Sequence, residues 1–256
     1  MTELNQGLTT RRARRRSRPQ SESVKGITHK VLPVLVLLLT AVLVFAGGRM
    51  TFAGMASYQA EAFLEDWAGK AEEPAPRAWA VAHEAAQRAV ALYPVANGEY
   101  LDRLGRVYSW QQFTKPYGSP EAQASRLAAL EGYRASTQAR PTWPQTWARL
   151  AHTKLQLAQF DDEFRQALAQ ANELGPTRIM VQREVMTVAF AAWPQLNASE
   201  RERVLQSARL SVIYSIREAQ RIYQMALHAG ITEPLCESLD PELQSKRRVC
   251  QFFTKT

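Results

Sequence analysis

Residues 143–176 read WPQTWARLAHTKLQLAQFDDEFRQALAQANELGP, and this stretch decides the fold. Spacings of three and four place one set of side chains on a single helix face: Trp147, Leu150, Ala151 and Lys154. After a turn at residues 158–161, Asp161 or Asp162 can cap a second helix. Gly175 can adopt the left-handed conformation that ends a helix, and Pro176 cannot continue the hydrogen-bond ladder. The second helix then carries its apolar face on Phe164, Leu168 and Ala171.

This pattern resembles a tetratricopeptide-type helical hairpin, which cannot bury its apolar face alone and therefore needs neighbours. Residues 97–110 supply one, because they contain the spacing Leu-x2-Leu-Gly-x2-Tyr, and residues 123–139 form its partner helix. An insertion at residues 113–120 lengthens this unit by about 12 residues relative to a 34-residue repeat. The positions that we assign to the repeat are Leu101, Leu104, Gly105, Tyr108, Trp147, Leu150, Phe160, Phe164 and Pro176.

The remaining helices follow from the same periodicity. Residues 78–93 are predicted to pack through Ala82, Ala86 and Ala89, against a helix at residues 58–70. Residues 178–193 form another apolar helix, and a capping box at Ser199 and Glu202 opens one long helix to about Ala229. The sequence therefore predicts an all-α, tetratricopeptide-like (TPR-like) solenoid of about seven helices over residues 58–230, after one transmembrane helix. The stripe expected on residues 58–70 is Tyr58, Ala62, Phe63 and Trp67.

The transmembrane helix is predicted over residues 31–53. Residues 31–48 are uncharged and apolar, just long enough to cross a bilayer, which needs roughly 20 residues. Pro33 is expected in the first turn, where it does little harm. A cleavable signal peptide is the alternative, but the long flanking and apolar regions argue against cleavage. We expect the chain to contact the membrane through residues 31–52.

The net charge of +8 is concentrated in a tail. Residues 1–30 contain eight Lys or Arg and two Glu, a net charge of +6, which leaves +2 for the rest. We expect this tail to be disordered. Nucleic-acid binding is one interpretation, but an adjoining apolar helix favours a topogenic tail, so no nucleic-acid partner is expected. The tail would then lie in the cytoplasm and everything after the helix in the periplasm.

The only two cysteines, Cys236 and Cys250, lie in the C-terminal segment 231–256, on the side where disulfides persist. A helix starting near Asp240–Pro241 would bring Cys250 back toward Cys236. A disulfide is therefore a candidate, and two free thiols are the alternative.

The sequence shows no recognisable catalytic or metal-binding motif. It has no HExxH, no paired Cys-x2-Cys, no phosphate-binding glycine loop and no Gly-x-Ser-x-Gly. His152 is interpreted as a packing or surface residue. The acids at residues 161–163 suit a helix start better than a cation site. A glycosidase would need two converging carboxylates, to which nothing points. We therefore expect no enzyme activity, no cofactor and no metal.

Aromatic side chains around the insertion suggest a contact site for a partner or a glycan, since both stack well on aromatic rings. Packing within the core is the competing interpretation, above all for Trp143 and Trp147. The candidate contact residues are Trp110, Phe113, Tyr117 and Trp143.

Three segments of the sequence resemble a known family. They are residues 91–110, which contain ALYP and EYLDRLGRVYSW; residues 140–148, which read RPTWPQTWA; and residues 159–176, which contain QFDDEF and ELGP. They resemble VpsP-like single-pass accessory proteins of bacterial exopolysaccharide biosynthesis clusters, over residues 80–195. The chain is more distantly similar to the helical-repeat tails of O-antigen ligases and polysaccharide polymerases, but it has one predicted span where those have many. The resemblance implies an inner-membrane scaffold that binds proteins of a polysaccharide assembly system. The alternative is a direct glycan-binding or glycan-processing protein.

Overall fold

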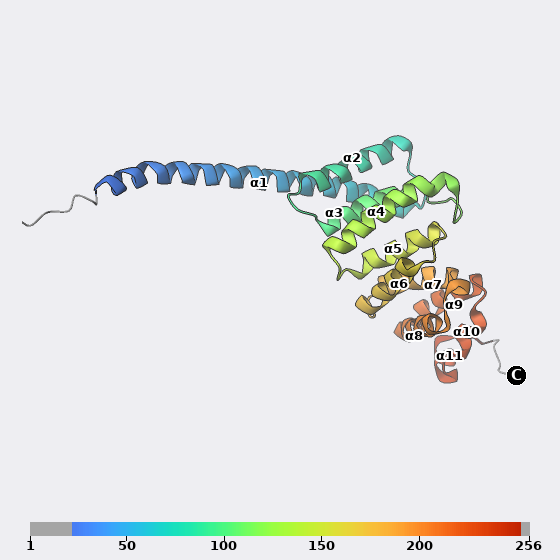
Figure 1. Ribbon diagram of the computed structural model, residues 1–256. Coiled ribbons are helices and arrows are strands. Elements are labelled where there is room, and N and C mark those ends of the chain that lie inside the picture. The colour runs from blue at the N-terminus through green and yellow to red at the C-terminus, as the bar shows by residue number, and fades with distance from the viewer. Residues whose placement is uncertain (1–21, 252–256) are drawn as a thin grey trace, which may run out of the picture. The chain divides into compact units, whose positions relative to one another are not determined.

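The computed structural model describes residues 22–251, with side chains from residue 31 onward. Within that range the chain is all-α and contains no strand (Figure 1). It divides into two compact units, Met1–Gly48 and Arg49–Thr256. The described α-helices are α1 (Glu22–Lys70), α2 (Pro76–Leu92), α3 (Gly98–Trp110), α4 (Gln123–Ala139), α5 (Pro144–Gln156), α6 (Asp162–Leu174), α7 (Ile179–Ala191), α8 (Ala198–Tyr214), α9 (Ile216–His228), α10 (Thr232–Glu237) and α11 (Pro241–Arg247).

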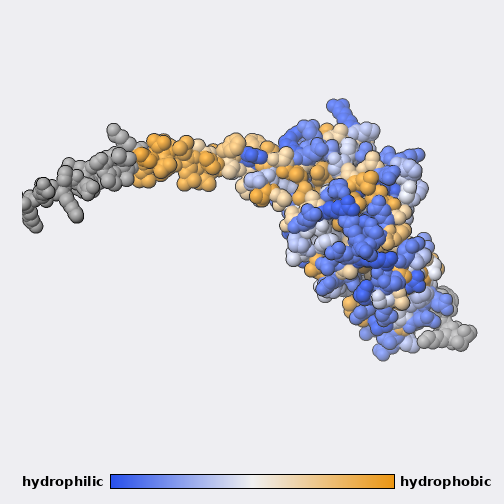
Figure 2. All heavy atoms as spheres, viewed as in Figure 1, coloured by the Kyte–Doolittle hydropathy of each residue, from blue (hydrophilic) through white to orange (hydrophobic). Residues whose placement is uncertain are grey.

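Helix α1 contains a segment that is long and apolar enough to cross a membrane. Nearly all side chains of residues 31–45 are exposed, and Figure 2 shows a hydrophobic surface along this part of the helix. The helix begins at Glu22, so the expectation of disorder is wrong for residues 22–30. Helix extension is easy once an apolar helix has formed, because each added residue gains a hydrogen bond. Residues 1–21 of the expected tail lie outside the described residues.

From Ala53 onward α1 buries one face, as expected of a helix that joins a folded domain. The predicted stripe is wrong in part, because Tyr58 and Ala62 are exposed. The buried face runs along the neighbouring row instead: Ala53, Ala56, Ala60, Leu64 and Trp67. The last three of these form a small core with alanines of α2 and with Val107 of α3.

The following helices pack as hairpins, with α3 against α4 and α5 against α6 making the most extensive contacts. Asn97 caps α3, and Asp161 caps α6 through a hydrogen bond from the Phe164 N–H. Gly175 ends α6, but in a non-left-handed conformation, which corrects the expectation. Glycine is required there by crowding, since a Cβ would lie 2.9 Å from Val181 and 3.1 Å from Pro144. Leu150 and Phe164 are buried as predicted, and Tyr108, Trp147 and Phe160 pack partly buried against the same core.

The last helix predicted for residues 58–230 is two helices, so eight α-helices, α2 to α9, follow α1 up to residue 230, where about seven helices were expected. Ser215 breaks the helix in an extended conformation and caps α9 by accepting from the Glu218 N–H. The capping box that opens α8 uses Asn197 and Glu200, two residues before the predicted pair. In both places the cap is the S/N-x-x-E signature of a helix start.

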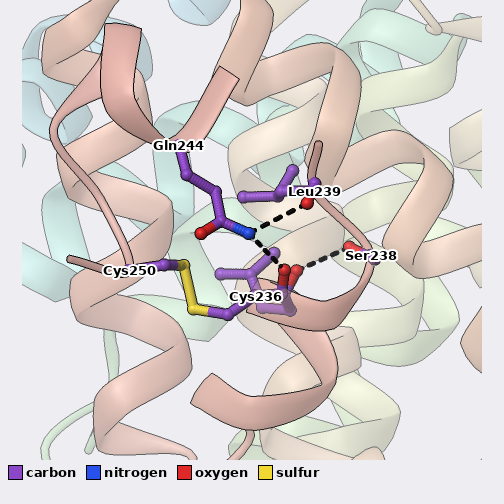
Figure 3. The surroundings of a disulfide bond; sticks show 6 residues. Cys236, Ser238, Leu239, Gln244 and Cys250 are labelled. Atoms are coloured by element: carbon purple, nitrogen blue, oxygen red, sulfur yellow. Dashed lines mark hydrogen bonds between the residues drawn. A yellow bond between two sulfur atoms is a disulfide. The ribbon is translucent and has the colours of Figure 1, made fainter. Parts of the chain in front are cut away.

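The C-terminal segment is closed by a disulfide between Cys236 and Cys250, with the Cα atoms 5.7 Å apart (Figure 3). This is the pairing expected from the sequence. Both cysteines are buried in the main core. Gln244 of α11 donates to the carbonyl oxygens of Cys236 and Leu239, at 2.8 and 2.9 Å. These bonds join α11 to α10, and both short helices contact α8 and α9.

Helices α3 and α4 approach closely because glycines face each other. A Cβ on Gly132 would lie 3.0 Å from the Gly105 Cα. A Cβ on Gly105 would lie 2.8 Å from the ring of the buried Tyr133 and 3.2 Å from the Ala129 carbonyl oxygen. The repeat position assigned to Gly105 is therefore occupied by glycine for a steric reason.

We predict that Gly105→Ala lowers the free energy of unfolding by about 1–3 kcal/mol, the usual cost of overpacking. Helix propensity alone would give the opposite sign, since alanine is favoured over glycine within a helix. Gly69→Ala is the matched control, because a Cβ there meets nothing within 4 Å. Urea unfolding of the full chain in detergent measures both. A Gly105→Ala protein as stable as the control would contradict this packing.

A buried ion network ties α5 to its neighbours. Lys154 has only 1% of its side chain exposed, and its ammonium donates to Asp161 at 2.7 Å and to Glu163 at 2.6 Å. Glu163 also accepts from Arg134 of α4, at 2.7 and 2.6 Å. The Arg134 hydrogen bond, opposed by burial and reinforced by Lys154, lowers the pKa of Glu163 to about 2.

This pKa predicts an acid-sensitive stability. The folded-state pKa of Glu163 lies below the value of about 4.3 for a free glutamate, so folding favours the ionised form. The stabilisation is complete above the unfolded pKa and disappears as the pH falls toward 2. Glu163→Gln should lower stability at pH 7 and flatten its fall between pH 5 and pH 2.5. The control is Glu84→Gln, because the Glu84 side chain is 72% exposed. This change should alter neither the stability at pH 7 nor its fall between pH 5 and pH 2.5. Urea midpoints across this pH range test it; parallel curves for Glu163→Gln and wild type would refute it.

Candidate functional site: an inner groove on α3, α5 and α7

A groove of about 370 Å³ runs across three helices, α3, α5 and α7. A second hollow of about 280 Å³ continues it toward the start of α3 and shares Arg106, Gln145 and Arg149 with it. We call the two together the inner groove. Its principal side chains are Asp102, Arg106, Ser109, Trp110, Gln145, Arg149, His152, Met180 and Glu184.

The groove arises from a repeated register. Helices α3, α5 and α7 are each 13 residues long, with N-caps at Asn97, Trp143 and Arg178. Their second residues all line the groove, as do their sixth residues and two of their ninth residues, because these positions share one helix face. These groove residues are Glu99, Gln145 and Met180; Arg103, Arg149 and Glu184; and Arg106 and His152.

Each cation at the α3 end of the groove is paired with a carboxylate. Arg149 donates to Asp102 at 2.5 Å, and Asp102, which is buried, also accepts from Thr146 at 2.8 Å. Arg106 donates to both oxygens of Glu61 at 2.9 Å. The walls are therefore rich in charge but nearly balanced, which suits a polar ligand recognised through hydrogen bonds.

At the α7 end, His152 Nδ1 is hydrogen-bonded to the Glu184 carboxylate. Burial raises the pKa of Glu184, but the hydrogen bond and charge of His152, together with Arg149, outweigh it and lower the pKa overall. Glu184 is thus held as an anion that orients the imidazole. The other ring nitrogen, Nε2, has no hydrogen-bond partner among the described residues.

The residues from 22 to 251 contain no group of three or more His, Cys, Asp and Glu that could hold a metal. The acids at residues 161–163 are used otherwise: Asp161 caps α6, and Asp161 and Glu163 bind Lys154.

The four predicted contact residues do not form one site. Trp110 lines the groove and packs against Phe113, with ring centroids 4.7 Å apart. Trp143 lines the second hollow, where the Arg140 guanidinium lies 3.4 Å from its ring centre. Tyr117 lies in a different groove, next to α7 and α9.

Sequence reasoning missed most of the polar side chains that define the groove, and it interpreted His152 as a packing or surface residue. The missed residues include Asp102, Arg106, Arg149 and Glu184. A signal was present, since aligning the three N-caps places Arg103, Arg149 and Glu184 at one position.

Comparison with protein-family models finds no match to the chain, and comparison with curated protein sequences finds none either.

Proposed function

We propose that the protein is a non-enzymatic, membrane-anchored scaffold on the periplasmic side of a bacterial inner membrane. It assists exopolysaccharide assembly or export by binding a partner protein in the inner groove. The observation that carries this proposal is the groove itself, a polar face built from the same positions of three alternate helices, α3, α5 and α7.

The architecture supports a tetratricopeptide-like interpretation. Interhelical spacings of 8–10 Å make a face of three helices about 20 Å across, which fits an extended segment of roughly six residues. Paired side chains that are fixed by mutual hydrogen bonds need little reordering when a partner binds. The exopolysaccharide role rests on the resemblance of residues 80–195 to the VpsP-like proteins.

The charges support binding without catalysis. A glycosidase needs one carboxyl group whose pKa is raised so that it can donate a proton. Glu184, the groove acid on α7, has a lowered pKa, and so does Glu61 at the α3 end. These two carboxylates therefore present fixed negative charges rather than a transferable proton.

Direct glycan binding is the second candidate, and Trp110 favours it. This ring lies at the groove wall beside Arg106 and Gln145, and sugars stack on aromatic rings next to planar hydrogen-bonding groups. The Trp110 ring is also packed against Trp67 and Phe113, which favours a role in the core.

The proposed topology places the N-terminus in the cytoplasm and the helical domain in the periplasm. The Arg-rich tail beside the apolar helix supports it, as does the disulfide, because disulfides persist outside the cytoplasm. Alkaline phosphatase fused after Thr256 should be active in a Gram-negative host. Green fluorescent protein at the same position, exported by the Sec route, should be dark. A fluorescent fusion with an inactive phosphatase would place the domain in the cytoplasm.

The docking role predicts that blocking the groove stops polysaccharide production without unfolding the protein. Met180 in the groove and Val95 outside it are matched apolar residues, 64% and 66% exposed. Met180→Glu on the chromosome should reduce secreted polysaccharide at least tenfold, toward the level of a deletion strain, at unchanged protein level. Val95→Glu should leave it unchanged. Normal production by the Met180 variant would overturn the role of the groove.

A further inference from the structure

The insertion between α3 and α4 is held in place by a buried arginine. Arg126 of α4 is 3% exposed and donates to three carbonyl oxygens: Lys115 at 2.5 Å, Pro116 at 2.8 Å and Gln156 at 2.9 Å. The Gly118 N–H also donates to the Gln156 carbonyl, at 2.8 Å. Two residues of the insertion and the end of α5 are thus joined through one side chain.

Burying the Arg126 guanidinium costs free energy, so we ask what the buried group provides. No carboxylate in the described part of the chain forms a salt bridge with Arg126, so all its partners are neutral carbonyl groups. Burying a guanidinium with neutral partners alone is unfavourable. Burial lowers the pKa of Arg126 accordingly. What the arginine provides is a fixed backbone on either side of Tyr117. A loop that is already ordered loses less entropy when it binds.

Tyr117 forms one wall of a second groove, the Tyr117 groove, of about 430 Å³. Phe190 of α7 and Met225 of α9 contribute to the other walls, and the lining is mostly apolar. Tyr117 itself is 53% exposed. Exposed tyrosine and adaptable methionine are enriched where proteins bind other proteins. This volume is sufficient to accept one or two apolar side chains.

The charges of the Tyr117 groove have one sign. Arg221 and His228 are its titratable side chains besides Tyr117, and no acid is among the lining residues. The nearby acid Glu218 lies on the same helix, is buried and is bound to Arg183 of α7. Its carboxylate is also 3.8 Å from Arg221, whose side chain is 50% exposed and so remains accessible to a ligand. An acidic ligand therefore meets no repulsion from the lining and gains from Arg221.

We propose that the Tyr117 groove binds a short apolar segment of a partner protein that carries an acidic side chain next to its apolar residues. The apolar residues pack between Tyr117, Phe190 and Met225, and the carboxylate pairs with Arg221. This site shares no lining residue with the inner groove. It goes beyond the proposed function, since it stands whether or not the inner groove binds a partner.

A displayed library of random 12-residue peptides, selected against the full chain in phosphatidylcholine nanodiscs, tests this. Selected peptides should combine apolar residues with Asp or Glu. A synthetic copy of one should bind at least tenfold more weakly to Tyr117→Ala and to Arg221→Glu. The controls are Tyr58→Ala and Arg217→Glu. Tyr58 is an exposed tyrosine of α1, and Arg217 is an exposed arginine of α9, the helix that also carries Arg221. Neither residue lines the groove. Both controls should bind as the wild type does.

Four outcomes would overturn the proposal. Selected peptides could be basic, or their binding could be insensitive to both groove variants. In the third, wild-type protein forms dimers that Tyr117→Ala dissociates in sedimentation, so a second copy of this chain occupies the groove. Loss of peptide binding in Met180→Glu alone would assign the peptides to the inner groove and would equally contradict the Tyr117 site. Retained binding in Met180→Glu supports the Tyr117 site even if the scaffold role fails.

Discussion

The central hairpins depend on the ion pairs that the buried Lys154 ammonium group forms with Asp161 and Glu163. The ammonium group lies on α5, on the face that packs into the body, with carboxylates of the α6 N-terminus around it. Because Glu163 also binds Arg134, the network fixes α4, α5 and α6 together. Removing one member of such a network leaves charges without partners, so the three helices hold their relative positions as a set. The opposite face of α5 carries Arg149 and His152, and the network therefore also positions the inner groove.

Tyr108 occupies the same position in α3 that Lys154 occupies in α5, and it too makes a polar contact. Its hydroxyl is 2.7 Å from His83 of α2, and the His83 ring stacks on Trp79. Burial lowers the pKa of His83, which favours a neutral imidazole between these aromatic rings. Two successive hairpins thus use the same position to join helices by partly buried hydrogen bonds. Apolar packing sets the spacing of the stack, while these polar contacts set its register.

Much of this architecture could be predicted from local sequence. Helix periodicity, the glycine at Gly105 and the cap at Asp161 depend on residues close in the chain, and their physical reasons are local. The break at Ser215 was missed although Ser215 and Glu218 carry the capping signature, because the apolar pattern continues across it. The inner groove could not be predicted from neighbouring residues. His152 meets Glu184 and Asp102 meets Arg149 only after the hairpins stack, and such pairs leave no trace in a single helix.

The proposed scaffold role requires that the inner groove receives a protein segment. A photo-crosslinking amino acid at Gln145, in the groove, tests this directly in living cells, with Leu127 on the exposed surface of α4 as the reference position. If a protein segment binds there, Gln145 gives a discrete, protease-sensitive crosslinked band that contains a protein of the polysaccharide assembly machinery. Leu127 then gives no crosslinked band. A protease-resistant ladder that a glycosidase removes, or a band from Leu127 alone, would contradict it.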